Sequence, residues 1–84
     1  MEALVFSTPK CTWCEKVIRV LKDVNIKVDK IDITENRENY DMMTNAAGDV
    51  KTVPQVVVDG KYIGGYTEIE RFLRKEKLLN AEGI

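Results

Sequence analysis

The chain has 84 residues, a formal net charge of −1 and no histidine. Its length fits one domain over residues 1–84, and its small net charge argues against a nucleic-acid partner held by bulk charge. The lack of histidine excludes Cys–His nucleophilic catalysis and zinc sites that use histidine. No apolar stretch approaches the ~18 residues that span a membrane, and the first residues lack the basic start of a secretory signal. We therefore expect a cytoplasmic protein with no membrane and no nucleic-acid partner.

The first part of the chain predicts a strand, a helix and a second strand. The short apolar run over residues 3–6 is typical of a strand that is buried on both faces. A helix is expected over residues 12–24, because four apolar residues recur there at the spacing of one helical face: Val17, Val20, Leu21 and Val24. Residues 27–33 predict the next strand. Together the three segments have the size of a right-handed βαβ unit.

The next part of the chain predicts a helix and a β-hairpin. Thr34 is expected to cap a helix over residues 35–47, which Gly48 would end. Asp59 and Gly60 lie between two short apolar runs. These two residue types readily take the positive φ angles of a type I′ turn, so they predict a tight hairpin.

The last predicted element is a helix, for which Thr67 and Glu70 have the spacing of a capping box. The complete order is β-α-β-α-β-β-α. A parallel βαβ unit followed by an antiparallel hairpin and a helix predicts an α/β protein of thioredoxin-like fold. Its mixed four-stranded sheet would be flanked by three helices.

Cys11 and Cys14 are the residues with the clearest chemistry. Cys11 falls at the expected helix N-terminus, where unpaired backbone N–H groups and the helix dipole favour a thiolate, and Lys10 beside it adds a positive charge. Such positions lower the pKa of a thiol from about 8.5 to roughly 3.5–7.5. Cys14 lies one turn into the helix and should be more buried. The pair therefore predicts a redox centre in which Cys11 is the attacking thiolate and Cys14 the resolving thiol.

A Cys-x-x-Cys pair also occurs in zinc sites and in structural disulfides. Zinc usually takes four protein ligands, and this chain has two cysteines and no histidine. A disulfide between residues three apart closes a loop too small to stabilise the fold strongly through chain entropy. Redox chemistry is therefore favoured over both alternatives, and no metal site is expected.

Two other segments have features of a binding groove, and each also has a plainer interpretation. Pro54 precedes the third strand, where a cis peptide bond would leave the backbone of Val53 free to pair with an extended peptide, although trans is the commoner form. The pair Gly64-Gly65 precedes the last helix, whose N-terminal N–H groups favour a carboxylate. A flexible turn with a cap would explain the same glycines.

Taken together, these segments resemble the glutaredoxin family, specifically the small dithiol glutaredoxins of bacteria and phages. The resemblance covers essentially the whole chain, and three motifs carry it: Cys11-x-x-Cys14, Thr52-Val53-Pro54-Gln55 and Ile63-Gly64-Gly65-Tyr66-Thr67-Glu68. It implies a glutathione-dependent oxidoreductase that reduces protein disulfides and glutathione mixed disulfides. It also implies that Pro54 is cis and faces the two cysteines.

The resemblance further implies a glutathione-binding groove, made by Lys10, Trp13, Thr52, Val53, Pro54, Gly65, Tyr66, Thr67 and Glu68. Val53 would pair with the tripeptide backbone. Backbone groups of Tyr66 and Thr67 would meet the γ-glutamyl carboxylate, and Glu68 would lie near the glutamyl amine. The candidate for the glycine carboxylate is Lys10, with Arg37 second. Residues 10–30 hold six Lys or Arg against three acids, which suits an anionic substrate or simply a solvated helix face.

One departure from the family pattern leaves alternatives open. The family most often has Pro-Tyr between its cysteines, where this chain has Thr12-Trp13. Relatives that lack this proline include dimers that hold a [2Fe–2S] cluster, and a thioredoxin-like carrier reduced by a flavoenzyme is a third alternative. The leading expectation is a monomer that uses glutathione and acts on disulfide-bearing proteins. Ribonucleotide reductase is the partner that the resemblance suggests first.

Overall fold

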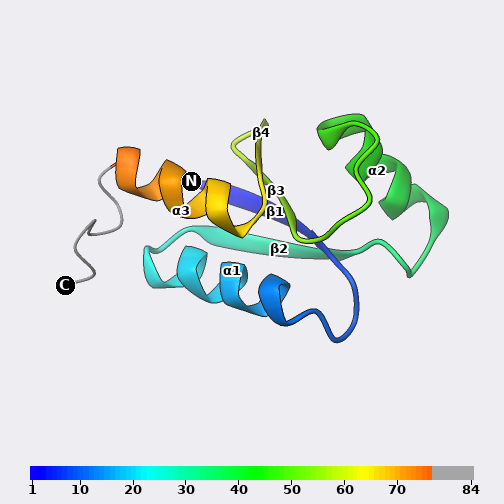
Figure 1. The fold of residues 1–84 in the computed structure, drawn as a ribbon, viewed down its shortest axis with the longest axis horizontal. Helices are drawn as coiled ribbons and strands as arrows, with labels where there is room; N and C mark the ends of the chain where they lie inside the picture. The colour runs from blue at the N-terminus through cyan, green and yellow to red at the C-terminus, as the bar shows by residue number, and fades with distance from the viewer. Residues whose placement is uncertain (77–84) are drawn as a thin grey trace.

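The structure is a computed structural model that describes residues 1–76. Its elements follow the predicted order β-α-β-α-β-β-α (Figure 1). They are β1 (Glu2–Ser7), α1 (Thr12–Asp23), β2 (Lys27–Asp32), α2 (Arg37–Ala47), β3 (Gln55–Val58), β4 (Lys61–Gly64) and α3 (Tyr66–Lys75). Within this part of the chain, no helix is long and apolar enough to cross a membrane.

The four strands form one mixed sheet in the order β2-β1-β3-β4. β1 pairs in parallel with β2, and α1 makes the connection between them. β1 also pairs antiparallel with β3, which in turn pairs antiparallel with β4. The predicted thioredoxin-like fold is therefore confirmed. Because β1 is a central strand, the loop that follows it and carries Cys11 leaves from the middle of the sheet.

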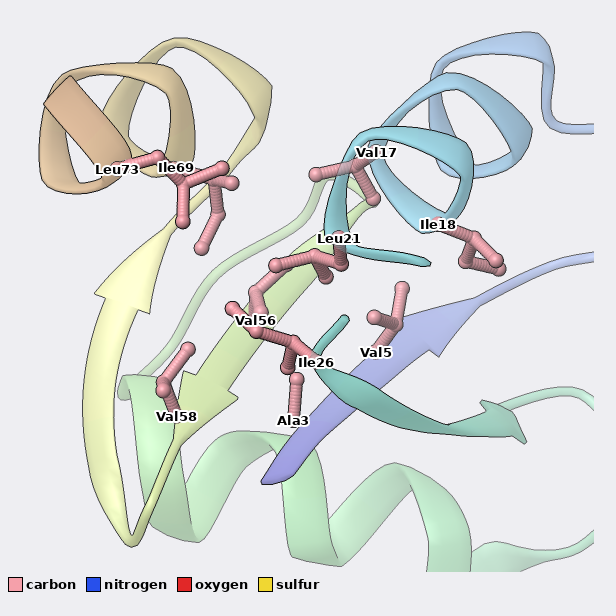
Figure 2. Packing of buried hydrophobic residues seen from close by; sticks show 10 residues of the cluster. All are labelled: Ala3, Val5, Val17, Ile18, Leu21, Ile26, Val56, Val58, Ile69 and Leu73. Atoms are coloured by element: carbon pink, nitrogen blue, oxygen red, sulfur yellow. The ribbon is translucent and has the colours of Figure 1, made fainter. Parts of the chain in front are cut away.

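Two hydrophobic clusters fill the two faces of the sheet, and alternation along β1 separates them. Ala3 and Val5 belong to the cluster under α1 and α3, whereas Leu4 and Phe6 belong to the cluster under α2. Figure 2 shows the first cluster, made of Ala3, Val5, Val17, Ile18, Leu21, Ile26, Val56, Val58, Ile69 and Leu73. Burying a side chain of this size contributes about 1.5–3 kcal/mol. α1 is thereby held firmly against β1.

The buried face of α1 begins at Cys14. Its buried residues are Cys14, Val17, Ile18 and Leu21. The predicted stripe shared two of these, but Val20 and Val24 are only half-buried and pack at the edge of the cluster. The buried stripe has the predicted spacing but begins three residues earlier, in the first turn of the helix. Cys14 is consequently a core residue.

The predicted cap of α2 is wrong. The backbone N–H and the hydroxyl of Thr34 both donate to Oδ1 of Asp32, at 2.8 and 2.6 Å, so Thr34 belongs to a turn that ends β2. These bonds hold the pKa of Asp32 below its ordinary value, the hydroxyl having the larger effect. The helix instead begins at Arg37, where Oδ1 of Asn36 accepts the N–H of Asn39 at 2.8 Å. Thr34 and Asn36 are both residue types that cap helices. Thr34 is hydrogen-bonded to Asp32, so Asn36 is the cap.

The predicted capping box of α3 is also wrong, by two residues. Thr67 and Glu70 lie inside the helix, which begins at Tyr66 with Gly65 as its N-cap. Oε1 of Glu68 accepts the N–H of Gly65 at 2.9 Å. Gly65 has no side chain to complete the second half of the box. The first turn of α3 therefore begins directly after the paired glycines.

The predicted hairpin is confirmed. Asp59 and Gly60 have φ angles of 49° and 82°, as a type I′ turn requires. Asp59 has a second role, because its N–H donates to the carbonyl of Glu2 and its Oδ1 accepts the N–H of Glu2, both at 2.9 Å. The turn is thus tied to the start of β1.

Gly64 is required by its own backbone and by Glu68. Its φ is 133°, which side-chain-bearing residues rarely adopt. A Cβ at this position would lie 2.8 Å from Cγ and 2.9 Å from Cβ of Glu68. The close approach that the paired glycines suggested is therefore made here by the chain itself.

Gly64→Ala should lower the free energy of unfolding by at least ~2 kcal/mol, because backbone strain and crowding each cost roughly 1–3 kcal/mol. Gly48→Ala is the matched control, since Gly48 also has a positive φ, 85°, but a Cβ added to it would have no atom within 4 Å. Urea unfolding of both variants should give the larger loss for Gly64→Ala. Equal losses would show that Glu68 moves aside without cost.

Candidate active site

Cys11 and Cys14 form a disulfide at the start of α1, with their Cα atoms 5.2 Å apart. Cys11 is the N-cap of the helix. Its Sγ accepts the N–H of Cys14 at 3.1 Å, and its carbonyl accepts the N–H of Glu15, also at 3.1 Å. The sulfur of Cys11 thus takes the position that a capping oxygen usually occupies.

The two sulfurs have different environments. Cys14 is 0% exposed and belongs to the buried face of α1, whereas Cys11 is half-buried. A backbone N–H that donates to a sulfur at a helix N-terminus stabilises the thiolate over the thiol. After reduction, Cys11 would therefore combine access to solvent with stabilisation of its reactive form. Cys14 has no such access.

A pocket of about 320 Å³ adjoins this turn of the helix. It joins three parts of the chain: the first turn of α1, the loop before β3 with the start of that strand, and β4 with the first turn of α3. Its lining residues are Trp13, Thr52, Val53, Pro54, Gln55, Tyr62, Gly65, Tyr66, Thr67 and Glu68. All the predicted groove residues except Lys10 are brought together here.

The loop before β3 forms one wall of this pocket. The peptide bond between Val53 and Pro54 is cis, as the resemblance implied, and Pro54 is buried. A Cβ on Gly65 would come within 3.3 Å of the carbonyl oxygen of Pro54. Gly65 therefore allows the loop and the start of α3 to lie close together.

An aromatic pair forms the wall next to the cysteines. The rings of Trp13 and Tyr66 have centroids 5.3 Å apart and an interplanar angle of 57°. Nζ of Lys16 lies 4.4 Å from the centroid of the Trp13 ring, which is within the range of a cation–π interaction. Trp13 is 53% exposed, so these contacts orient an indole that solvent and substrates can still reach.

Gln55 and Tyr62 line the pocket but were missed as site residues by the sequence analysis. The hydroxyl of Tyr62 donates to Oε1 of Gln55 at 2.6 Å. Nε2 of Gln55 donates to the carbonyl and to the hydroxyl of Thr52, at 3.0 and 3.2 Å. Gln55 is 6% exposed, and a buried amide needs partners. In the sequence, the sign of this role is a single polar residue, Gln55, directly before three valines of a buried strand. The relay fixes the loop before β3 to β4.

Glu68 has a structural role inside the pocket. One of its carboxylate oxygens, Oε1, accepts the N–H of Gly65 and so caps α3. Its negative charge lies at the helix N-terminus, among the unpaired N–H groups of the first turn. The same residue therefore serves the helix and presents an anion to the pocket.

A second pocket, of about 290 Å³, continues from the first through Thr52 and Val53, which line both. Its other lining residues are Thr8, Ile33, Tyr40, Met43, Val50 and Lys51. Lys51 is the basic residue of this lining, and no sequence pattern indicates it. Lys10 is exposed, has a φ of 62° and lines neither pocket.

Arg37, the second predicted candidate for a substrate carboxylate, lies elsewhere. Its Nε donates to Oδ1 of Asp41 at 3.0 Å in an exposed pair one helical turn apart. It lines a shallow depression with Asn36 and Tyr40 rather than either pocket near the cysteines. Among residues 1–76, no group of three or more metal-ligating side chains is placed to hold a metal ion.

A thioredoxin-like sheet with a Cys-x-x-Cys disulfide at the N-terminus of α1, next to a cis-proline loop, defines a thiol–disulfide redox protein. Comparison with known proteins identifies the family within this class of redox proteins. The family model "Glutaredoxin" matches residues 3–63. The chain belongs to the glutaredoxin family, a family of thiol oxidoreductases.

Individual relatives agree with this assignment. Human mitochondrial glutaredoxin-2 is 32% identical in a 79-residue alignment that covers 90% of this chain and 48% of that protein. The chain thus spans about half the length of such curated relatives. The structure of a buckwheat glutaredoxin–glutathione complex has a TM-score of 0.73 and 25% identity over 90% of this chain and 71% of its own. Oxidised Escherichia coli glutaredoxin has a TM-score of 0.70 and 25% identity over 89% and 95%.

The different burial of the two cysteines predicts their order of alkylation. In the reduced native protein, iodoacetamide should modify Cys11 at least about tenfold faster than Cys14, because only an accessible thiolate reacts quickly. Peptide mapping by mass spectrometry measures the two rates. In urea the two rates should converge. Faster modification of Cys14 in the native protein would contradict the assigned asymmetry.

Proposed function

We propose that this glutaredoxin is a glutathione-dependent oxidoreductase that reduces protein disulfides and glutathione mixed disulfides. The observation that carries the proposal is the pocket beside the Cys11–Cys14 disulfide. It combines an irregular loop at Val53, which an extended peptide could pair with, and a helix N-terminus at Tyr66, which favours a carboxylate. Glutathione is a short extended peptide with two carboxylates.

The reaction follows from the positions of the two sulfurs. The Cys11 thiolate attacks one sulfur of the substrate disulfide, a new S–S bond forms, and the other substrate sulfur leaves as a thiolate that takes a proton from water. Cys14 then attacks Sγ of Cys11, which releases the second substrate thiol and forms the Cys11–Cys14 disulfide. Two glutathione molecules reduce this disulfide in succession and leave as glutathione disulfide.

The pocket suggests how glutathione would lie. The backbone of Val53 would pair with the cysteinyl residue of the tripeptide. The unpaired N–H groups at Tyr66 and Thr67 would receive the γ-glutamyl carboxylate. The carboxylate of Glu68 would attract the glutamyl amine while it continues to cap α3. Trp13 would cover the reacting sulfur from the side.

The glycine carboxylate would lie at the other end of the tripeptide, beyond Val53. The second pocket continues in that direction, and Lys51 lines it. We therefore propose Lys51 as the partner of this carboxylate. The sequence-based candidate, Lys10, is adjacent to Cys11 and instead adds positive charge near the attacking sulfur.

The proposed cellular role is that of a cytoplasmic, monomeric electron donor to disulfide-bearing enzymes. Ribonucleotide reductase is the first such partner to test, on the basis of the family resemblance. The charge distribution supports an anionic substrate near α1, since residues 10–30 carry six Lys or Arg against three acids.

Glutathione-dependent reduction of a small mixed disulfide, coupled to NADPH through glutathione reductase, tests the function. The wild type should turn over, Cys11→Ser should be inactive, and Cys14→Ser should retain activity, because removing a glutathione adduct needs only the first cysteine. With a protein disulfide as substrate, Cys14→Ser should lose activity as well.

An inactive wild type would overturn the glutathione assignment. Turnover with NADPH and a thioredoxin-reductase flavoenzyme would then identify a reductase-fed carrier. A visible absorbance band and dimer formation after anaerobic reconstitution with iron and sulfide would identify a cluster-binding protein.

Lys51→Met tests the proposed carboxylate partner. It should raise the KM for glutathionylated substrate roughly tenfold, since a charge-assisted hydrogen bond is worth about 1.5 kcal/mol, and should leave kcat nearly unchanged. Lys10→Met is the matched control, because it removes the same charge outside both pockets. A larger KM effect for Lys10→Met would reverse the assignment.

A further inference from the structure

The hydroxyl of Ser7 is an anomaly in the core. Ser7 is 0% exposed, and its Oγ is the only buried side-chain polar atom of residues 1–76 that has no hydrogen-bond partner. Native proteins rarely leave such a group unpaired, so each case calls for an explanation. The carbonyl of Ser7, by contrast, accepts the N–H of Ile33 at 3.0 Å.

Alternation along β1 determines which way Ser7 faces. Ala3 and Val5 contact the cluster under α1, as Figure 2 shows, while Leu4 and Phe6 contact the opposite cluster. Ser7 follows Val5 by two residues and therefore points to the same face, towards α1. It is also the last residue of β1. Its hydroxyl thus lies at the end of the strand that leads into the cysteine loop.

The packing of α1 on β1 brings Cys14 to the same end. β1 and β2 are parallel and α1 connects them, so α1 runs antiparallel to β1. From Val5 to Ser7 the strand advances about 6.6 Å. From Ile18 back to Cys14 the helix advances about 6 Å in the same direction. Val5 and Ile18 belong to one cluster between the sheet and α1, so these two advances carry Ser7 and Cys14 towards the same end of that interface.

We propose that Ser7 is a positioning residue for the resolving cysteine. When the Cys11–Cys14 bond opens, the Ser7 hydroxyl donates a hydrogen bond to the sulfur of Cys14. The hydroxyl has no partner in the oxidised protein, so this bond is made only after the disulfide opens, when the negative charge of a thiolate strengthens the sulfur as an acceptor. No histidine is present to assist Cys14. The hydroxyl stabilises the buried sulfur in the form that attacks.

This inference rests on the thiol–disulfide chemistry proposed above but not on glutathione. The balanced equilibrium is protein disulfide plus two thiols giving protein dithiol plus the thiol's disulfide. The hydrogen bond exists only on the dithiol side, so it favours reduction. Its removal should shift the equilibrium towards the protein disulfide and make the protein a stronger reductant.

The experiment equilibrates the protein with 2-mercaptoethanol and its disulfide, and reads the ratio of the two protein forms after acid quenching and alkylation. Ser7→Ala should shift the equilibrium constant about tenfold towards the disulfide, which corresponds to about 30 mV for this two-electron couple. Ser7→Thr keeps the hydroxyl and should remain within about twofold of the wild type.

Urea unfolding in both redox states separates this role from a structural one. Ser7→Ala should lower the stability of the reduced protein but not that of the oxidised protein. An unchanged equilibrium constant for Ser7→Ala, or equal stability changes in both states, would overturn the inference. A wild type that equilibrates normally here but fails with glutathione would overturn the proposed glutathione dependence and leave the role of Ser7 standing.

Discussion

The hydrogen bond from the N–H of Cys14 to the sulfur of Cys11 is the interaction on which the site depends. It makes the reactive residue the cap of its own helix, so the first turn of α1 and the position of the sulfur are held by one contact. The helical spacing then places the second cysteine on the face that packs against β1. A half-buried sulfur and a fully buried sulfur three residues apart follow from helix geometry, and no additional catalytic group is needed to make them differ.

The remainder of the site is assembled against this turn by the sheet order. Because β3 pairs with β1, the loop before β3 arrives beside the loop after β1. Because α3 packs on the same face as α1, its first turn meets the same place, and Trp13 contacts Tyr66. Gly65 allows this approach, since a side chain there would crowd the carbonyl of Pro54. The pocket is a junction of three segments rather than a property of any one.

Turn and capping motifs predicted the structure correctly where only one residue pair could fill the position. They failed where two nearby residues could each cap the same helix. The Asp59-Gly60 turn was predicted correctly, because few residue pairs can adopt its φ angles. The caps of α2 and α3 were each placed two residues away from the true position. Thr34 had been engaged by Asp32, and Glu68 rather than Glu70 reaches back to the helix start. Capping motifs recur at short intervals in polar sequence, and only the packed chain selects among them.

The element order, the thioredoxin-like fold and the redox pair could be predicted from the amino-acid sequence, because hydrophobic periodicity and the three-residue spacing of the cysteines are local properties. The sequence also indicated most of the pocket through motifs that resemble a known family. The tertiary structure alone decided that Tyr62 joins the pocket through Gln55, that Lys51 and not Lys10 lines its extension, and that the Ser7 hydroxyl is buried without a partner. Each of these depends on strand register or on the packing of a helix over a strand, which bring together residues that no local pattern connects.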